Sequence, residues 1–446
     1  MVLKMTIKFK KQLDIIKKNK NLNFFLSIIK EENNLNGHLE NLTFAIKDNF
    51  NYINTITTGG SLFLENYYSP YNSTVVELLI KSGAKPICKA NMDEFGLGGT
   101  GLYSGYGHVI NPIDSKRIPG GSSSGSAVAT KIDACDFALG TDTGDSIRKP
   151  ASYLGIIGYK PTYGLISRYG VLPYSPSLDH VGLFSKKIEI ISQVMNVIAK
   201  YDEKDFTSQI NKIDFTTDDQ FKFFKVGIID ETFIDIKPEI KKQFMNKIKL
   251  LKKLEIAHLN YNPKLLDLIP ITYNILSYSE AVSCYQNMST VTFGPHSEST
   301  NFEESAIKAR SKLFGSELKR RFLIGAYCTS HDNYEKLFLK SAKVRTKIII
   351  EYRKLLENND VIISLGSSDI APLVEDVERN NYQDLYADLY LQIANFGGFP
   401  SITVPFLEID NNPIGINITG KINDDVKVLT VAKYIIETLE KSSNHA

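Results

Sequence analysis

Residues 120–126, GGSSSGS, lie at the centre of an alternating pattern of short strands and helices. An Ala-Val-Ala run that suits a helix follows directly. We therefore predict a structured loop that leads into a helix over residues 126–139, and not a flexible linker. A second glycine-containing loop, GTDTGDSIRKP, occupies residues 140–150. The sequence thus places two unusual loops on either side of one helix.

Apolar runs before these loops have the lengths that strands and helices take in α/β proteins. Residues 43–46 and 86–88 are short and apolar, which is typical of buried strands. Between them, residues 75–82 have helical spacing and end just before Gly83, a residue type that favours helix ends. This alternation predicts an α/β fold.

The rest of the chain is expected to add helices and to complete the sheet late. Residues 1–40 have helical spacing with lysines on the other face, which predicts two surface helices. Residues 202–221 are polar and indicate a linker or surface excursion. Beyond them the spacing predicts strands at 226–229, 361–363 and 402–404 and helices at 240–254, 276–288 and 334–356.

We expect a single domain over residues 1–446, and its composition is that of a globular chain. It is 43% hydrophobic and 23% charged, which allows a large core and excludes intrinsic disorder. The expected parts are N-terminal helices (1–40), a core (41–200), a helix-rich insertion (201–360) and a segment that completes the sheet and ends in a helix (361–446).

Charge and cysteine usage exclude several classes of function. The chain has 52 Lys+Arg against 50 Asp+Glu, a net charge of +2, so any contact with RNA must be local or belong to a partner. Cys88, Cys135, Cys284 and Cys328 are too far apart for a zinc or disulfide motif, and we expect buried, reduced thiols. No apolar run reaches the length of a signal peptide or membrane span, which favours a cytosolic protein.

Three common structural roles of a Gly/Ser-rich run do not fit the sequence around GGSSSGS. A linker would not be followed at once by a helix. A phosphate-binding loop needs Gly-Lys-Ser/Thr, which is missing here. A nucleophile elbow centred on Ser123 needs a preceding strand, and the preceding residues 117–119 contain a proline that cannot donate to a sheet.

The second loop places Ser146 where backbone N–H groups can converge on an oxyanion. A serine needs a base, and none of the seven histidines lies in a setting that pairs it with either loop. Lys47 ends the apolar run 44–46, so burial could lower its pKa into the range of a base. Taken alone, a lysine at a strand end is more often a surface charge.

Together, the GGSS-G-S run, the D-T-G-x-S-I-R-x-P run of residues 142–150 and the K-D-N of residues 47–49 resemble the amidase signature family. The resemblance implies a large central mixed sheet covered by helices on both sides. It also implies a catalytic triad in which Ser146 is the nucleophile, Ser122 is a bridging serine on a cis peptide and Lys47 is the base.

The resemblance implies further site residues and a chemistry. The backbone N–H groups of Thr143, Gly144, Asp145 and Ser146 would stabilise the oxyanion, and Ser123 would contact the substrate. An amide carbonyl would be attacked and ammonia would leave. No metal or cofactor is expected on this chain.

Residues 91–95, 160–164, 167–170 and 177–179 narrow the resemblance to the amidotransferase branch of the family. Members of this branch hydrolyse glutamine and pass ammonia to a companion B subunit, which uses ATP and magnesium to amidate Glu-tRNA(Gln); a small C subunit braces the two. The branch implies that Arg321 holds the glutamine α-carboxylate and Asp388 its α-ammonium. The alternative for this pair is an ordinary surface ion pair.

Two positions depart from the family pattern, because Ser124 and Asp145 replace glycines. A carboxylate at position 145 would lie near a developing negative charge, so we predict that it points away, toward Arg148 or Lys149. Two other functions stay open: a stand-alone amidase that acts on a small amide, and a catalytically inactive scaffold that only binds the companion subunits.

Overall fold

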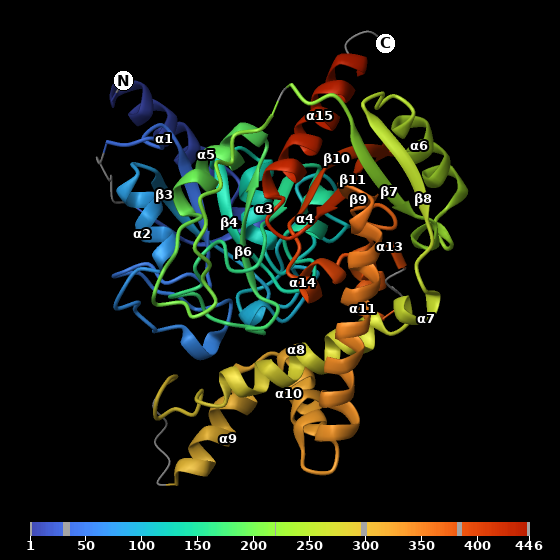
Figure 1. Cartoon of the computed structure of the whole chain (residues 1–446). Helices are drawn as coiled ribbons and strands as arrows, with labels where there is room; N and C mark the ends of the chain where they lie inside the picture. The colour runs from blue at the N-terminus through green and yellow to red at the C-terminus, as the bar shows by residue number, and fades with distance from the viewer. Residues whose placement is uncertain (1, 30–35, 219, 296–300, 381–385, 444–446) are drawn as a thin grey trace.

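The computed structural model describes residues 2–29, 36–218, 220–295, 301–380 and 386–443, and its centre is one large mixed sheet (Figure 1). The sheet has eleven strands in the order β1-β3-β2-β4-β6-β5-β10-β11-β9-β7-β8. The strands are β1 (Phe25–Ile28), β2 (Thr43–Lys47), β3 (Lys85–Ala90), β4 (Phe137–Asp142), β5 (Ile157–Lys160), β6 (His180–Ser185), β7 (Phe224–Ile229), β8 (Leu254–Leu259), β9 (Val361–Leu365), β10 (Ser401–Ile409) and β11 (Asn412–Gly420).

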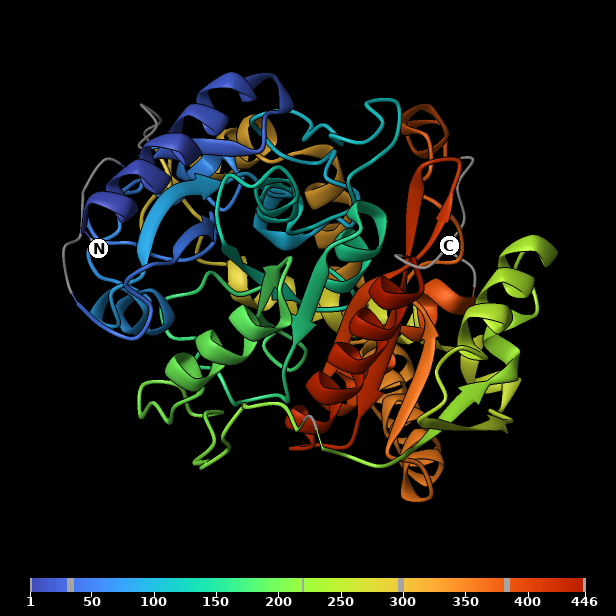
Figure 2. The same cartoon turned by 90° about the horizontal axis from the view of Figure 1, so that it is seen from above.

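Helices cover the sheet on both sides, which confirms the predicted α/β class (Figure 2). The helices are α1 (Val2–Lys18), α2 (Thr74–Lys81), α3 (Ser124–Lys131), α4 (Arg148–Leu154), α5 (Ile188–Ile198), α6 (Pro238–Ile248), α7 (Pro263–Leu266), α8 (Ile269–Tyr285), α9 (Phe302–Leu313), α10 (Ser316–Thr329), α11 (Lys340–Glu357), α12 (Val374–Glu378), α13 (Tyr386–Tyr390), α14 (Ile393–Gly397) and α15 (Asp425–Ser443).

Strands β2 and β4 are parallel neighbours, and this pairing positions the site. Ile46 of β2 lies opposite Leu139 of β4. Because side chains alternate across a strand, Ala45 faces a different core cluster from Ile46, one that also contains the alanines of α3. The carboxyl ends of both strands lie at the same edge of the sheet, so Lys47 and Asp142 are brought together.

One predicted helix is wrong and a second one is too long. Residues 25–28 form β1, which pairs antiparallel with β3 and has Phe25 opposite Ala90, so backbone pairing at the sheet edge prevails over the helical spacing of the apolar residues. The helix predicted over 126–139 stops at Lys131. The left-handed Asp133 (φ 60°) follows that end, and residues 137–142 enter the sheet as β4 between β2 and β6.

Most strands and helices after residue 200 lie where the sequence predicts them. The predicted strands at 226–229, 361–363 and 402–404 lie in β7, β9 and β10, and the described residues of 202–221 form no helix or strand. The insertion is rich in helices, and α8 and α10 pack against each other below the sheet (Figure 1). The helix predicted over 240–254 is shorter, because α6 ends at Ile248 and β8 begins at Leu254.

Several predicted absences concern the described part of the chain. No helix there combines the length and apolar composition that a bilayer span requires. The four cysteines are free; Cys284 is half-buried and the other three are buried. No group of three or more His, Cys, Asp or Glu side chains among the described residues could hold a metal ion.

Candidate active site

Lys47, the last residue of β2, is fully buried among hydroxyl groups. Its Nζ donates hydrogen bonds of 2.8 Å to each of three oxygens: Ser122 Oγ, Ser123 Oγ and Thr141 Oγ1. Asn49 in turn donates to Thr141 Oγ1 at 3.2 Å. No carboxylate of the described residues lies within ion-pair distance of this ammonium group.

This environment changes the protonation of the amine. Burial lowers the pKa of Lys47 from 10.5 to about 7, although the more distant charges of Asp93, Asp142 and Asp179 act in the opposite direction. A substantial fraction of the amine is therefore uncharged near neutral pH and can accept a proton.

The two unusual loops meet at this amine. The Gly121–Ser122 peptide bond is cis, which agrees with what the family resemblance implies. The Ser123 N–H donates to the Ser146 carbonyl at 3.3 Å, which fixes the first loop against the second. Ser122 and Ser146 are 2% and 5% exposed, so both are nearly closed to solvent. Within the described residues Ser122 touches Lys47, but no hydrogen bond joins the Ser122 and Ser146 hydroxyls.

Ser123, expected to contact the substrate, has its hydroxyl directed elsewhere. It is fully buried, accepts from Lys47 and donates to the Thr141 carbonyl at 3.1 Å. The structure therefore gives this hydroxyl a place in holding Lys47. Sequence reasoning also missed Thr141, whose polar side chain at a strand end gave no local signal.

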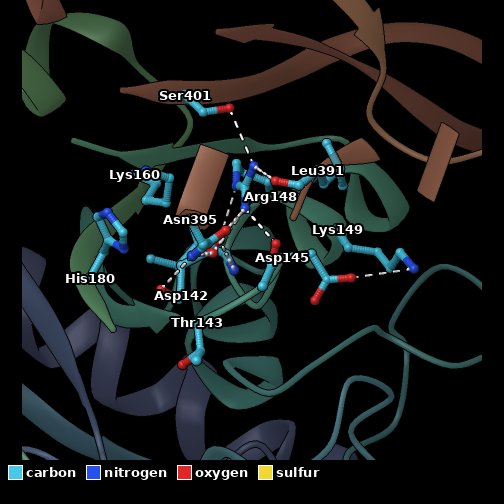
Figure 3. A network of polar contacts seen from close by, with 12 residues as sticks. Asp142, Thr143, Asp145, Arg148, Lys149, Lys160, His180, Leu391, Asn395 and Ser401 are labelled. Carbon is cyan, nitrogen blue, oxygen red and sulfur yellow. Dashed lines mark hydrogen bonds and ion pairs between the residues drawn. The ribbon is translucent and has the colours of Figure 1, made fainter. Parts of the chain in front are cut away.

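Arg148 anchors the loop that carries Ser146 (Figure 3). Its guanidinium is fully buried and binds both carboxylate oxygens of Asp142, at 3.1 and 3.0 Å. It also donates to the Gly144 carbonyl at 2.7 Å and to Asn395 Oδ1 at 2.6 Å. The Arg148 charge keeps the pKa of Asp142 below its usual range despite burial.

The predicted oxyanion loop lies close to the insertion. A Cβ at Gly144 would stand 2.8–2.9 Å from the phenol group of Tyr273 in α8, so any larger residue here would require the Tyr273 side chain to shift. The N–H groups of Gly144 and Ser146 donate to no acceptor among the described residues, which leaves them available to an oxyanion. Tyr273 was not identified from the sequence, because nothing near it marks it.

A cavity of about 280 Å³ borders this loop. Its lining includes Asp145, Lys149, Tyr273, Tyr278 and Arg321. The Arg321 guanidinium donates to Glu317 at 2.6 Å and to the Tyr174 hydroxyl at 3.2 Å. Arg321, which is predicted to bind the glutamine α-carboxylate, therefore reaches the cavity from α10. The same cavity borders the loop that carries Ser146.

Asp388 and Asp145 approach the same lysine. Asp388 is 1% exposed and accepts from the Ser368 N–H at 3.2 Å. Lys149 Nζ lies 3.5 Å from Asp388 Oδ1 and 3.3 Å from Asp145 Oδ2. The prediction that Asp145 points toward one of its two basic neighbours is confirmed for Lys149. Ser124, the other replaced glycine, is fully buried at the start of α3.

Comparison with known proteins agrees with this geometry. A family model described as Amidase matches residues 27–429. The chain is 43% identical over 413 residues to the A subunit of glutamyl-tRNA(Gln) amidotransferase from Mycoplasma genitalium, covering 88% of this chain and 85% of that protein. Its identity to the corresponding protein of Methanosarcina mazei, which bears the same name, is 35% over 446 residues, covering 97% and 92%.

Solved structures show the same fold. The crystal structure of the A subunit of glutamyl-tRNA(Gln) amidotransferase from Thermotoga maritima superposes with a TM-score of 0.80 at 32% identity, covering 96% of this chain and 90% of that one. Allophanate hydrolase from Kluyveromyces lactis superposes with a TM-score of 0.81 at 24% identity, a level that shows the fold alone.

Proposed function

The chain belongs to the amidase family, and from this premise we propose that it hydrolyses the side-chain amide of glutamine and supplies ammonia to a tRNA-dependent amidotransferase. The contact that carries the proposal is the 2.8 Å hydrogen bond between Lys47 Nζ and Ser122 Oγ, because it joins a buried amine of lowered pKa to a serine of the first loop. The names of relatives that cover most of the chain support the amidotransferase branch.

In the proposed reaction, uncharged Lys47 takes the proton of Ser122 as Ser122 takes that of Ser146. Ser146 Oγ then bonds to the amide carbon. The resulting oxyanion accepts hydrogen bonds from the N–H groups of residues 143–146. When the tetrahedral intermediate collapses, the carbon–nitrogen bond breaks, the relayed proton goes to the leaving nitrogen, and ammonia departs. Water then cleaves the Ser146 ester by the same relay and releases glutamate.

Arg321 and Asp388 are proposed to recognise the glutamine backbone. A guanidinium can bind an α-carboxylate through two parallel hydrogen bonds, and a carboxylate suits an α-ammonium. Two opposite charges at one cavity select a zwitterion over a simple amide. The location of Arg321 in the cavity wall and the burial of Asp388 support this assignment.

We further propose that the chain works in the cytoplasm with companion B and C subunits. The B subunit would use ATP and magnesium to amidate Glu-tRNA(Gln) with the ammonia made here. The net charge of +2 supports leaving most of the tRNA contact to the partner.

One experiment separates this function from its rivals. Ammonia release from L-glutamine is measured for the chain alone, for the chain co-expressed with its B and C subunits, and for Ser146→Ala in the same complex. We expect release by the complex and none above background from the variant. Full activity of the isolated chain on small amides would indicate a stand-alone amidase. An unaffected Ser146→Ala complex would indicate an inactive scaffold.

A further inference from the structure

Lys149 is held between two carboxylates that come from distant parts of the chain. It lies in the first turn of α4 with a side chain only 6% exposed, and its ammonium faces Asp145 at 3.3 Å and Asp388 at 3.5 Å. Figure 3 shows its side chain reaching toward the Asp145 carboxylate. Both distances exceed the 2.7–2.9 Å typical of a strong charge-assisted hydrogen bond. Among the described residues, the cation is therefore shared between these two anions.

The shared cation borders the cavity assigned to glutamine. Asp145, Lys149 and Arg321 line that cavity, and so does Leu389, the neighbour of Asp388. A ligand whose ammonium approaches Asp388 meets the ammonium of Lys149 already there. Two like charges this close repel each other in a buried site, so the two ammonium groups compete for the same carboxylate.

Asp145 offers the displaced cation a second position. This carboxylate directly precedes Ser146, where negative charge develops during the proposed attack. A lysine that moves fully onto Asp145 would release Asp388 and would also neutralise the carboxylate beside the nucleophile. One small movement of the Lys149 side chain would therefore both free Asp388 for the ligand and neutralise Asp145.

We propose that Lys149 is a specificity-determining residue that competes with the ligand ammonium for Asp388 and shifts to Asp145 when an α-amino acid amide binds. The inference rests on the proposed function, because it takes the cavity to be the glutamine site. It implies that Lys149 weakens the preference of the pocket for ligands that carry an α-ammonium.

The test measures binding, so that it does not depend on turnover. In a Ser146→Ala background of the full chain with its co-expressed B and C partners, calorimetry gives the affinities for L-glutamine and for glutaramate, which is glutamine without the α-ammonium. The readout is the ratio of the two affinities. For Lys149→Gln we expect the preference for glutamine to rise about tenfold, because Asp388 loses the competing cation. Lys149→Arg should keep the parent ratio.

A second variant acts in the opposite direction. Asp145→Asn removes the Asp145 carboxylate as an alternative position, so Lys149 should remain closer to Asp388 and the preference for glutamine should fall. Lys186→Gln, which breaks the 2.8 Å ion pair with Asp133 away from this cavity, is the control for loss of one lysine and should not change the ratio.

The outcomes distinguish the two proposals. An unchanged or lowered ratio in Lys149→Gln, or an unchanged ratio in Asp145→Asn, overturns the role of Lys149 even when the complex hydrolyses glutamine. Conversely, ratios that move as expected in a complex that releases no ammonia would support the role of Lys149 and contradict the hydrolysis.

Discussion

Two fully buried basic side chains, Lys47 and Arg148, lie at the same edge of the sheet in opposite electrical surroundings. Arg148 binds Asp142 through Nε and Nη2 and donates to four further oxygens, on Gly144, Leu391, Asn395 and Ser401. Among the described residues, Lys47 has only the hydroxyls of three side chains and, at 3.4 Å, a carbonyl.

The comparison teaches that burial alone does not set the charge of a basic group. A carboxylate in bidentate contact offsets the desolvation of the Arg148 guanidinium, which therefore has a structural task. Hydroxyls repay much less, so the pKa of Lys47 falls to about 7 and its amine is left for proton transfer.

Lys47→Arg should abolish the contrast with Arg148, because it replaces the proposed catalytic base with a permanently charged guanidinium. Because guanidinium cannot give up its proton near neutral pH, we expect glutamine hydrolysis to fall about 10⁴-fold. The measurement is ammonia release by the reconstituted complex, with circular dichroism to confirm folding. A folded variant that keeps activity within tenfold of the parent would rule out Lys47 as the base.

Arg148→Met should remove the structural cation and leave the Asp142 carboxylate buried without it. We expect the free energy of unfolding to fall by about 3–5 kcal/mol, measured by urea denaturation of the chain. The matched control is Arg379→Met, which removes an arginine that lies 3.6 Å from Glu375 with both side chains well exposed. That change should cost less than about 1 kcal/mol; equal losses at both sites would contradict the structural role of Arg148.

Lowering the pH of the unmutated protein should affect Lys47 and the Asp142–Arg148 pair in different pH ranges. As pH falls below 7, Lys47 takes up a proton, so activity should decline, approaching about tenfold per pH unit. Asp142, whose pKa is lowered, contributes stability above its ordinary value near 3.8 and loses it only at lower pH. Between pH 8 and 6 the contribution of the Asp142–Arg148 pair should therefore stay constant.

The same titration predicts the sign of a stability change at high pH. The folded pKa of Lys47 is below its unfolded value, so the unfolded chain binds more protons between pH 7 and 10.5. The contribution of Lys47 to stability should rise across that window and stay constant below it. Urea denaturation of the parent and of Lys47→Met at pH 7 and 9 measures this contribution as a difference, and an equal stability change in both would contradict it.

Ser123→Ala should make the smallest change, because it removes one of the three side-chain hydroxyls around Lys47. The loss of one hydrogen-bond acceptor disfavours the charged amine, so the acid limb of the pH–activity profile should move to lower pH. We expect a loss of about 1 kcal/mol in stability. A shift of the profile to higher pH would contradict this account of how the amine is held.

The sequence was sufficient to predict the α/β class, and the family resemblance supplied Lys47, Ser122 and Ser146. Lys47 follows three apolar residues, which allowed its burial although a lysine at a strand end is more often a surface charge, and the glycine-rich loops marked the segments that meet it. The N-terminal segment was mispredicted because Phe24, Phe25, Ile28 and Ile29 have a spacing compatible with a helix. Only the free edge of β3 decides that they pair as a strand.

Contacts between distant segments could not be predicted. Arg148 and Asn395 are 247 positions apart, and no local pattern in either segment indicates the other. Tyr273 reaches Gly144 from a helix of the insertion, where apolar spacing predicts a helix but not which loop it covers. Such pairs depend on how the chain packs in three dimensions, which periodicity does not encode.

The hydrogen bond between Arg148 and the Leu391 carbonyl also has a consequence for biosynthesis. Lys47, Ser122 and Ser146 all leave the ribosome more than two hundred residues before Leu391. A nascent chain therefore carries every proposed catalytic side chain long before the Leu391 carbonyl and Asn395 join the partners of Arg148. Chains that terminate before residue 391 would keep the contacts of Arg148 with Asp142 and Gly144 but lack these later ones, so the full anchor of the Ser146 loop forms only after residue 395 has been synthesised.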